Sequence, residues 1–308
     1  MILYFIMAVA GLGLFMSGMR FLTTGLQSTA SLSLKNKIQG SKIHPVIGML
    51  LGVAVTMVIQ SSSAATVILV GMAEAGLLSL LQITPMIMGA NIGTTATAQL
   101  VAFDMAKVAP FIFILGLLLR SLKGRSIAKL GKPCMGFAMI FLGIELLSWG
   151  MLPLQNLFRF QEILEAMGEQ PILGILMGFF TTAIIQSSST GVAILQSLGA
   201  GGSITVFAAV PIMLGQNIGT CVTAMMAGVG LSLTGKRAAA IHLIFNVVGV
   251  MVVIPFIRQL CLFSIALAPD NVVRQIAHSH TFFNLFTTIL FLPFSRWFVK
   301  AASWLIRE

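Results

Sequence analysis

The chain alternates between long apolar segments and short polar or basic loops. The apolar segments run for roughly twenty residues without the two-residue alternation of a membrane β-strand, so they predict membrane-spanning helices. Two of the segments, 46–72 and 172–198, carry Gln-Ser-Ser-Ser near their centres, and we expect each to enter the membrane, turn there and return as a re-entrant hairpin. A straight span through each is the alternative. The expected spans are 2–27, 78–103, 107–120, 134–150, 204–230, 238–257 and 280–299.

The composition agrees with an all-α polytopic membrane protein of about seven spans. Hydrophobic residues make up 57% of the chain and charged residues 8%, with a mean hydropathy of +1.02, which excludes a water-soluble globule. The net charge of +10 comes from Lys and Arg in short loops and indicates membrane topology, so we expect no nucleic-acid partner. The three cysteines lack metal-ligand spacing.

An internal repeat is the most informative feature of the sequence. A shift of 126 positions aligns residues 48–98 with 174–224 without a gap, and the matches include polar residues and prolines. We expect a first unit at 1–130, with the N-terminal span, the hairpin at 46–72, a broken helix at 78–103, the span at 107–120 and a basic loop. We expect a second unit at 131–258, with the span at 134–150, the hairpin at 172–198, a broken helix at 204–230 and the span at 238–257. The rest, 259–308, is expected to form an outer loop and an extra C-terminal span.

Loop charge predicts that the two repeats are inverted in the membrane. The loop before the first hairpin carries lysines, whereas the loop before the second is mainly acidic, and basic loops favour the cytoplasm. We therefore expect a plasma-membrane protein with its N-terminus outside and its C-terminus in the cytoplasm. The residues concerned are Lys35, Lys37 and Lys42, then Arg159, Glu162, Glu165 and Glu169, and the basic linker Arg120, Lys123, Arg125, Lys129 and Lys132.

Four polar segments lie at membrane depth: the two Gln-Ser-Ser-Ser turns and the segments 89–95 and 215–221, each with Gly-x-Asn-Ile-Gly-Thr. Lipid offers no hydrogen-bond partner, so irregular backbone here must be buried in protein or line a wet cavity. Pro85 and Pro211 precede the Gly-x-Asn motifs and are expected to break each helix. Close helix packing through small residues is the alternative, but two copies of the pattern favour a transporter site at the midplane.

The charges of the repeats indicate what could bind there. Glu74 is the only charged residue between 46 and 103, and there is none between 171 and 230. An anion would be held by backbone N–H groups and helix N-termini, whose partial charges do not neutralise a dianion. Metal cations bound by hydroxyl and amide oxygens would supply the missing charge, and Na⁺ suits such ligands. Cation-coupled anion transport is the resulting hypothesis.

The doubled motif resembles the signature of the sodium/phosphate cotransporter family, which comprises the type II cotransporters and bacterial relatives. The similarity covers nearly the whole chain, including the His-x-x-Phe-Asn segments at His242 and His280. The resemblance implies inorganic phosphate as substrate and Na⁺ as coupling ion. It also implies substrate or ion contacts at Gln60, Ser61, Ser62, Ser63, Asn91, Thr94, Thr95, Gln186, Ser187, Ser188, Ser189, Asn217 and Thr220, with Ser62, Ser63, Asn91, Gly93, Ser188, Ser189, Asn217 and Gly219 as candidate Na⁺ ligands.

Two features depart from the family pattern. Cys221 stands where the first repeat has Thr95, which removes an oxygen ligand from a symmetric ion site. Many bacterial relatives also carry a soluble phosphate-regulatory helical domain, whereas this sequence stops at Glu308. Regulation through such a domain is therefore not expected.

We expect a secondary transporter, not an enzyme, that carries phosphate with Na⁺ by alternating access. The alternatives are Na⁺- or H⁺-coupled transport of another oxyanion or a dicarboxylate, a passive channel, and an intramembrane serine hydrolase. The sequence contains no Gly-x-Ser-x-Gly nucleophile motif. The expected partners are phosphate and membrane lipid, with a homodimer as one arrangement and no organic cofactor.

Four further groups have expected roles. Arg20 and Glu145 occupy near-equivalent places, and we expect separate roles: snorkelling for Arg20 and a buried hydrogen bond for Glu145. Glu74 is expected to be a solvated cap at the end of the first hairpin. His242 and His280 each precede an asparagine by four residues, a pattern explained either by proton transfer or by helix contacts.

Overall fold

The computed structural model describes residues 2–29, 43–103, 105, 107–122, 126–153 and 158–307. Within these ranges the chain is helical, with short 3₁₀ segments and no strand, so the all-α class is confirmed. The orientation argument from Lys35, Lys37, Lys42, Lys123 and Arg125 lies outside the described residues.

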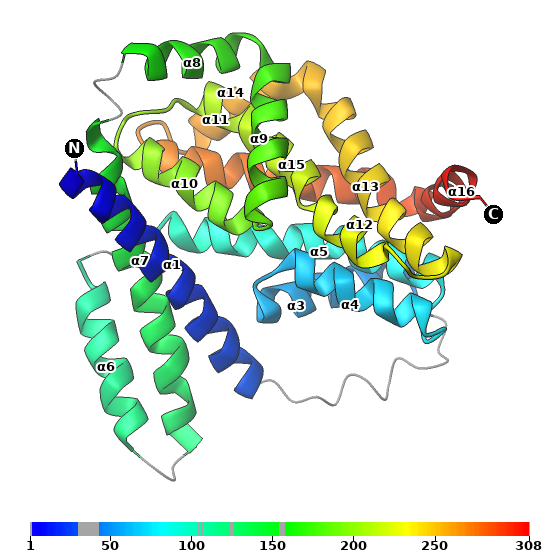
Figure 1. The fold of residues 1–308 in the computed structure, drawn as a ribbon, viewed down its shortest axis with the longest axis horizontal. Coiled ribbons are helices and arrows are strands. Elements are labelled where there is room, and N and C mark those ends of the chain that lie inside the picture. The colour runs from blue at the N-terminus through cyan, green and yellow to red at the C-terminus, as the bar shows by residue number, and fades with distance from the viewer. Residues whose placement is uncertain are drawn as a thin grey trace.

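The helices follow the chain in an order that places a helix on each side of both Gln-Ser-Ser-Ser turns (Figure 1). The first half contains α1 (Ile2–Thr29), α3 (Pro45–Ile59), α4 (Ser62–Glu74), α5 (Leu80–Val101) and α6 (Ala109–Ser121). The second half contains α7 (Gly131–Met151), α8 (Phe158–Glu169), α9 (Pro171–Ile185), α10 (Ser188–Ala200), α11 (Val206–Gly219), α12 (Cys221–Gly228), α13 (Leu233–Val253), α14 (Ile257–Leu267), α15 (Val272–Phe291) and α16 (Ser295–Leu305).

Five helical segments of the described chain are long and apolar enough to cross a membrane. They are Ile2–Leu22, Ile127–Met151, Val206–Gly228, Leu233–Leu267 and Val272–Leu305, which overlap five of the seven expected spans. The other two expected spans correspond to α5 and α6. Helix α6 has only 13 residues and is too short, whereas α5 is long enough but is rich in Thr, Gln, Asn and Gly and is therefore not apolar enough.

The predicted break in the helix at 78–103 is wrong, because α5 continues through Pro85 as one helix of 22 residues. Pro85 lies in the second turn of α5, where its missing N–H leaves a single carbonyl, that of Leu81, without its helical donor. The hydroxyls of Thr94 and Thr95 donate to the carbonyl oxygens of Ala90 and Ile92 at 3.1 and 2.8 Å, which satisfies these polar side chains inside the helix. In the second repeat, α11 and α12 are separated by Thr220 alone, whose φ of −59° and ψ of −27° are helical.

The glycines of the Gly-x-Asn motifs serve close packing instead. A Cβ atom added to Gly89 would lie 2.0 Å from the Met49 carbonyl oxygen of α3, and one added to Gly215 would lie 1.9 Å from the Ile175 carbonyl oxygen of α9. Neither approach leaves room for any side chain. Helix α5 therefore packs backbone to backbone on α3, and α11 packs on α9 in the equivalent way.

The segment 259–279, expected as an outer loop before the last span, is largely helical, because α14 continues to Leu267 and α15 begins at Val272. Ile257, Cys261 and Ser264 recur at four and three residues and form one buried helix face. The Ser264 hydroxyl lies 2.8 Å from that of Ser279 on α15. This amphipathic pattern, with contacts to α11 and α15, explains the helix.

The last four helices form a second, shorter repeat. A shift of 38 positions aligns His242 with His280, Pro255 with Pro293 and Arg258 with Arg296. In each copy a long helix ends in a three-residue 3₁₀ turn, which leads into an 11-residue helix, α14 or α16. Helix α13 contacts α4 and α5, and α15 contacts α10 and α11 in the equivalent way. In addition, α15 lies against α5 and α13 contacts α11. The two copies thus cover equivalent elements of the two halves.

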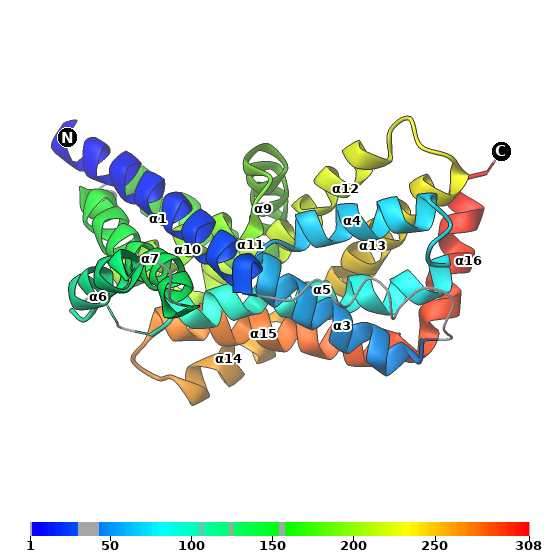
Figure 2. The ribbon, with the colours of Figure 1, turned by 90° about the horizontal axis from the view of Figure 1, so that it is seen from below.

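Two buried apolar clusters hold these elements together. One joins α10 and α11 to α14 and α15, and the other joins α4 and α5 to α13 and α16. Helices α5 and α15 lie side by side through the middle of the molecule, while α1, α6 and α7 form a separate arm (Figures 1 and 2). Helix α1 reaches both Gln-Ser-Ser-Ser turns from that arm, because its residues border the same cavity as the turns.

Candidate functional site

The two Gln-Ser-Ser-Ser turns have nearly the same backbone. Gln60 has φ 55° and Gln186 has φ 58°, and these are the two non-glycine residues with positive φ in the described ranges. Each glutamine N–H donates to a threonine carbonyl at 2.7 Å and closes the preceding helix, α3 or α9. A left-handed glutamine is strained relative to glycine, and such strain is concentrated at functional sites.

A serine directly after each glutamine starts the next helix. The Ser61 hydroxyl accepts from the Ala64 N–H of α4, and the Ser187 hydroxyl accepts from the Thr190 N–H of α10, both at 3.2 Å. Serine is a favoured N-cap because its side chain satisfies a donor that the helix leaves free. The sequence Gln-Ser thus ends one helix and begins another within two residues.

The glutamine side chains differ between the two turns. The Gln60 amide nitrogen donates to the Met57 carbonyl, and its oxygen accepts from the Thr97 hydroxyl of α5 at 2.7 Å. Gln186 is exposed, and its amide lies 3.9 Å from the Met226 sulfur. The first turn is therefore fastened to α5 more firmly than the second is to α12.

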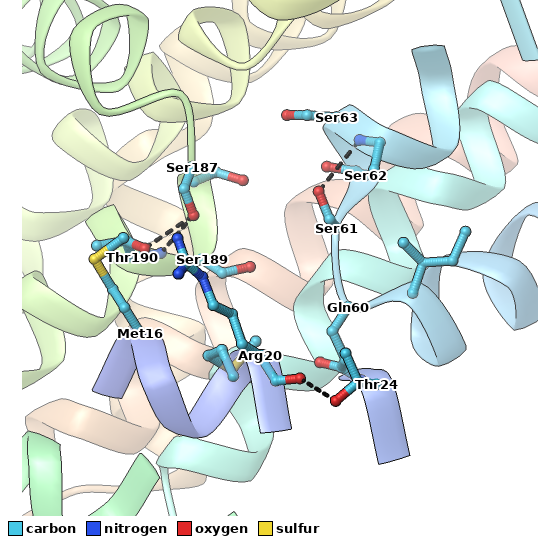
Figure 3. A pocket seen from close by; sticks show the side chains of 14 residues that line it. Met16, Arg20, Thr24, Gln60, Ser61, Ser62, Ser63, Ser187, Ser189 and Thr190 are labelled. Carbon is cyan, nitrogen blue, oxygen red and sulfur yellow. Dashed lines mark hydrogen bonds between the residues drawn. The ribbon is translucent and has the colours of Figure 1, made fainter. Parts of the chain in front are cut away.

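Both serine turns border one cavity of about 450 Å³, although they come from segments 126 residues apart. Figure 3 shows the turns facing one another across it, with α1 closing a third side. The hydroxyls of Ser62, Ser63 and Ser188 have no hydrogen-bond partner among the described residues, and these side chains are at most 8% exposed. The lining residues are Met16, Met19, Arg20, Thr24, Ile59, Gln60, Ser61, Ser62, Ser63, Ala64, Ser187, Ser188, Ser189 and Thr190.

Helices α4 and α10 both begin at this cavity. The first N–H groups of a helix have no carbonyl partner within it, and they carry the positive end of the helix dipole. Here they belong to Ser62 and Ser63 in α4 and to Ser188 and Ser189 in α10. Backbone donors from two helices and free serine hydroxyls can together bind an oxyanion.

Arg20 corrects the electrostatic argument made from the sequence. The repeats supply no side-chain cation, but α1 does: Arg20 lines the cavity and reaches toward Ser187, Ser189 and Thr190 (Figure 3). Arg20 is the only charged residue in the described part of the lining. The described lining therefore includes a side-chain cation, and the expectation that positive charge must come from metal ions alone is wrong. Glu145 is partly buried near the other end of the α1–α7 contact.

Arg20 is the site residue that the sequence reasoning missed. It is the only charged residue in α1, and a charged residue within a membrane span marks a functional site by default. Met16, Arg20 and Thr24 recur every four residues, which puts them on one helix face.

The remaining predicted residues lie outside the lining of this cavity, and all of them except the exposed Gln186 are buried in the helix packing. The structure does not bring Gln186, Asn91, Asn217, Thr94, Thr95, Thr220, Gly93 or Gly219 to the lining. The Asn91 amide donates to the Asn246 oxygen at 2.8 Å, whereas the Asn217 amide donates to the Met213 carbonyl at 3.0 Å. The Thr220 hydroxyl donates to the Gln216 carbonyl within α11.

Oxygen atoms suited to Na⁺ occur beside the turns. The hydroxyls of Thr56 and Thr182 are fully buried and have no partner among the described residues. The Cβ atoms of these two threonines lie against Gly93 and Gly219, the candidate ligand positions, at equivalent places in the two halves. Hydroxyl and carbonyl oxygens are ligands that hard cations accept. No cluster of three or more His, Cys, Asp or Glu side chains occurs in the described chain.

The late histidines lie in the same packed region as Asn91. His242 and His280 are at most 1% exposed, and neither ring nitrogen of either residue has a partner among the described residues. The Asn246 amide donates to the His242 carbonyl at 3.0 Å, and the Asn284 amide donates to the His280 carbonyl at 2.9 Å. The i, i+4 pattern is thus used for contacts within each helix.

Comparison with known proteins supports a role in phosphate transport. The family model described as Na⁺/Pi-cotransporter matches residues 14–149 and 154–268. The uncharacterized protein YqeW of Bacillus subtilis is 36% identical over 293 residues, which cover 95% of each chain. The putative inorganic phosphate export protein YjbB of Escherichia coli K12 is 25% identical over 308 residues, and this chain spans 56% of its length.

A shorter similarity connects the chain to animal transporters. The sodium-dependent phosphate transport protein 2B of Homo sapiens is 38% identical over 93 residues, which cover 28% of this chain and 13% of that protein. No solved structure matches. The Na⁺/Pi-cotransporter family consists of transporters rather than enzymes, and the apolar helices are those of a membrane protein. The chain therefore belongs to the Na⁺/Pi-cotransporter family.

Proposed function

We propose that this protein carries inorganic phosphate across the plasma membrane and that the cavity between the two serine turns is its binding site. One observation carries the proposal: two copies of the same strained turn, from opposite halves of the chain, border a single cavity together with an arginine. The names of the YjbB and 2B relatives, which specify phosphate, support the choice of substrate.

The proposal includes re-entrant hairpins. Helices α3 and α9 have 15 residues each, about 22 Å at 1.5 Å per residue. That length is too short to cross a hydrocarbon core of about 30 Å. A helix that enters from one surface and ends at its turn would thus place the serines within the membrane, where water reaches them only through the cavity.

Inverted repeats are the second structural element of the proposal, and the contact between α1 and α7 supports them. A Cβ atom on Gly11 would lie 2.7 Å from the Gly143 carbonyl oxygen, and one on Gly18 would lie 2.8 Å from the Gly136 carbonyl oxygen. The two helices are therefore antiparallel. Gly136 and Gly143 follow Gly11 and Gly18 by 125 positions, so exchanging the two helices reproduces the same pair of contacts. A two-fold axis between inverted units has this property.

Alternating access follows from such a pair of units: each hairpin would open the cavity toward its own side of the membrane in turn. In this arrangement residues 1–130 and 131–258 form the two units. Helices α13 to α16 cover them, with the N-terminus outside and the C-terminus in the cytoplasm.

Coupling to Na⁺ is part of the proposal and is supported by the name of the 2B relative and by the free hydroxyls of Thr56 and Thr182. When bound there, Na⁺ would supply a driving force and stabilise the packing of α3 on α5. Arg20 favours a second candidate, phosphate export without Na⁺, because its charge makes cations unnecessary for holding the anion. The YjbB relatives are named as export proteins.

Flux measurements in liposomes test both candidates. Purified protein would be reconstituted, and radioactive phosphate uptake would be measured with Na⁺ or choline outside at fixed proton gradient and voltage. Uphill accumulation that requires Na⁺ supports the cotransporter, and equal flux in choline supports the Na⁺-independent exporter. Absence of any phosphate flux contradicts both. Competition by sulfate, arsenate and succinate tests whether another oxyanion or a dicarboxylate is the substrate.

A further inference from the structure

Arg20 is the one cation among the described residues that line the cavity, and the other donors among them are neutral. Its position on α1 is set by packing outside the hairpins, since α1 lies against α7 along Gly11, Gly18 and Gly25. That contact turns the face with Met16, Arg20 and Thr24 toward the serine turns. Among the described residues no acidic side chain lines the cavity, so none of them neutralises the guanidinium there.

The charge of the lining points to an anion. Each helix N-terminus carries roughly half a positive charge, so α4 and α10 contribute roughly one unit together. Arg20 adds a full unit, which doubles the total. Without Arg20 the lining would hold a monovalent anion at best, whereas with it the lining matches the charge of a divalent oxyanion.

The chemistry of the free donors agrees with this. Ser62, Ser63 and Ser188 are nine-tenths buried, line the cavity and have no hydrogen-bond partner among the described residues. Hydroxyls and N–H groups satisfy oxyanion oxygens from two sides, and a guanidinium can donate two parallel hydrogen bonds from the third. A lysine at the same place would give charge without this paired geometry.

We propose that Arg20 binds the transported phosphate directly, through two hydrogen bonds from its guanidinium, while the serine turns hold the other oxygens. This inference rests on the proposed function and adds a residue from outside the repeated hairpins to the site. It makes α1 a substrate-binding helix as well as part of the α1–α7 pair.

The test compares three variants in detergent and in liposomes. Arg20→Gln removes the charge, Arg20→Lys keeps it, and Lys132→Gln is the matched control. Lys132 is on α7, outside the cavity lining, and its ammonium lies 5.5 Å from the centre of the Phe21 ring, which follows Arg20 on α1. Lys132→Gln therefore removes one positive charge close to Arg20 without changing the lining. Phosphate affinity would be measured by calorimetry and by the KM of uptake, with thermal unfolding to verify folding.

We expect Arg20→Gln to weaken phosphate binding about tenfold or more, as for loss of a charged hydrogen-bonding partner. Arg20→Lys should bind more weakly than the wild type but better than Arg20→Gln, and Lys132→Gln should match the wild type. If the wild type transports phosphate and the variants Arg20→Gln and Lys132→Gln bind phosphate with equal affinity, the inference about Arg20 is overturned and the proposed function stays intact. If Arg20→Gln fails to fold, the test rests on Arg20→Lys. A phosphate affinity equal to that of the wild type in Arg20→Lys would then refute the proposal that Arg20 binds phosphate through two paired hydrogen bonds. No phosphate binding or flux by the wild type would overturn both proposals.

Discussion

Replacing Gly89 by alanine tests the backbone contact that places the first serine turn. The new Cβ would lie 2.0 Å from the Met49 carbonyl oxygen, whereas ordinary contacts begin at 3.4 Å, so α3 and α5 must separate by about 1.4 Å (3.4 minus 2.0). The Met49 atoms that the new Cβ would meet are backbone atoms and cannot rotate away. Overpacking of this kind costs about 1–3 kcal/mol, partly offset by about 0.5–1 kcal/mol from replacing a helical glycine.

We expect the net loss in Gly89→Ala to lower the Tm in detergent by roughly 2–6 °C. Phosphate uptake should fall as well, because α3 carries Gln60 and would move the turn at its end. Gly215→Ala provides a second test, since its Cβ would lie 1.9 Å from the Ile175 carbonyl oxygen in the other half.

The matched control is Gly71→Ala on α4, where no atom lies within 4 Å of the added Cβ. That variant should keep its Tm or gain slightly, with unchanged uptake. If Gly89→Ala behaves like Gly71→Ala in both assays, the close packing of α3 on α5 is refuted, and the position of the turn must have another cause.

Two other side chains give further predictions. Thr97→Val removes the 2.7 Å hydrogen bond to the Gln60 oxygen and should lower the free energy of unfolding by about 1 kcal/mol in a thermal unfolding assay. The equivalent Thr223→Val should cost nothing, since the Thr223 hydroxyl is buried without a partner in the described chain. Equal losses of stability in the two variants would contradict the asymmetry of the turns. Glu74 accepts from the Ser232 hydroxyl at 2.7 Å and from the Ser232 N–H at 3.0 Å, and these bonds, the hydroxyl first, lower the pKa of Glu74 below 4.5. The stabilising effect of the Glu74 carboxylate is therefore complete above pH 4.5 and is lost as the pH falls through the lowered pKa. Glu74→Ala should thus reduce the Tm at pH 7 and have little effect in strong acid. If the Tm difference between Glu74→Ala and the wild type is constant across pH, the carboxylate is excluded as its cause.

The sequence could predict the turns because their chemistry is local. Gln60 and Gln186 end one helix and the next serine begins another, so helix ends at both turns follow from a few neighbouring residues. Glu74, expected as a cap at the end of the first hairpin, does accept hydrogen bonds at the start of α13. Motifs of this kind keep their meaning whatever the rest of the fold does.

Features that depend on packing between distant segments could not be predicted in this way. Pro85 indicates a broken helix, but close contact with α3 and the bonds within α5 keep the helix whole. Arg20 lies outside the repeated segments, so counting charges within the repeats missed it. Its place at the cavity depends on glycines of α1 and α7 that are more than a hundred residues apart.

The reciprocal glycine contact between α1 and α7 has a consequence for the origin of the molecule. Because the same surface serves on both helices, a protein made of one half alone could dimerise through it, provided that one copy inserted in each orientation. Gene duplication and fusion would then fix each copy in a single orientation, and the two halves would be free to diverge. Arg20 and Glu145, which differ at near-equivalent places, are the kind of specialisation that only a fused chain can acquire.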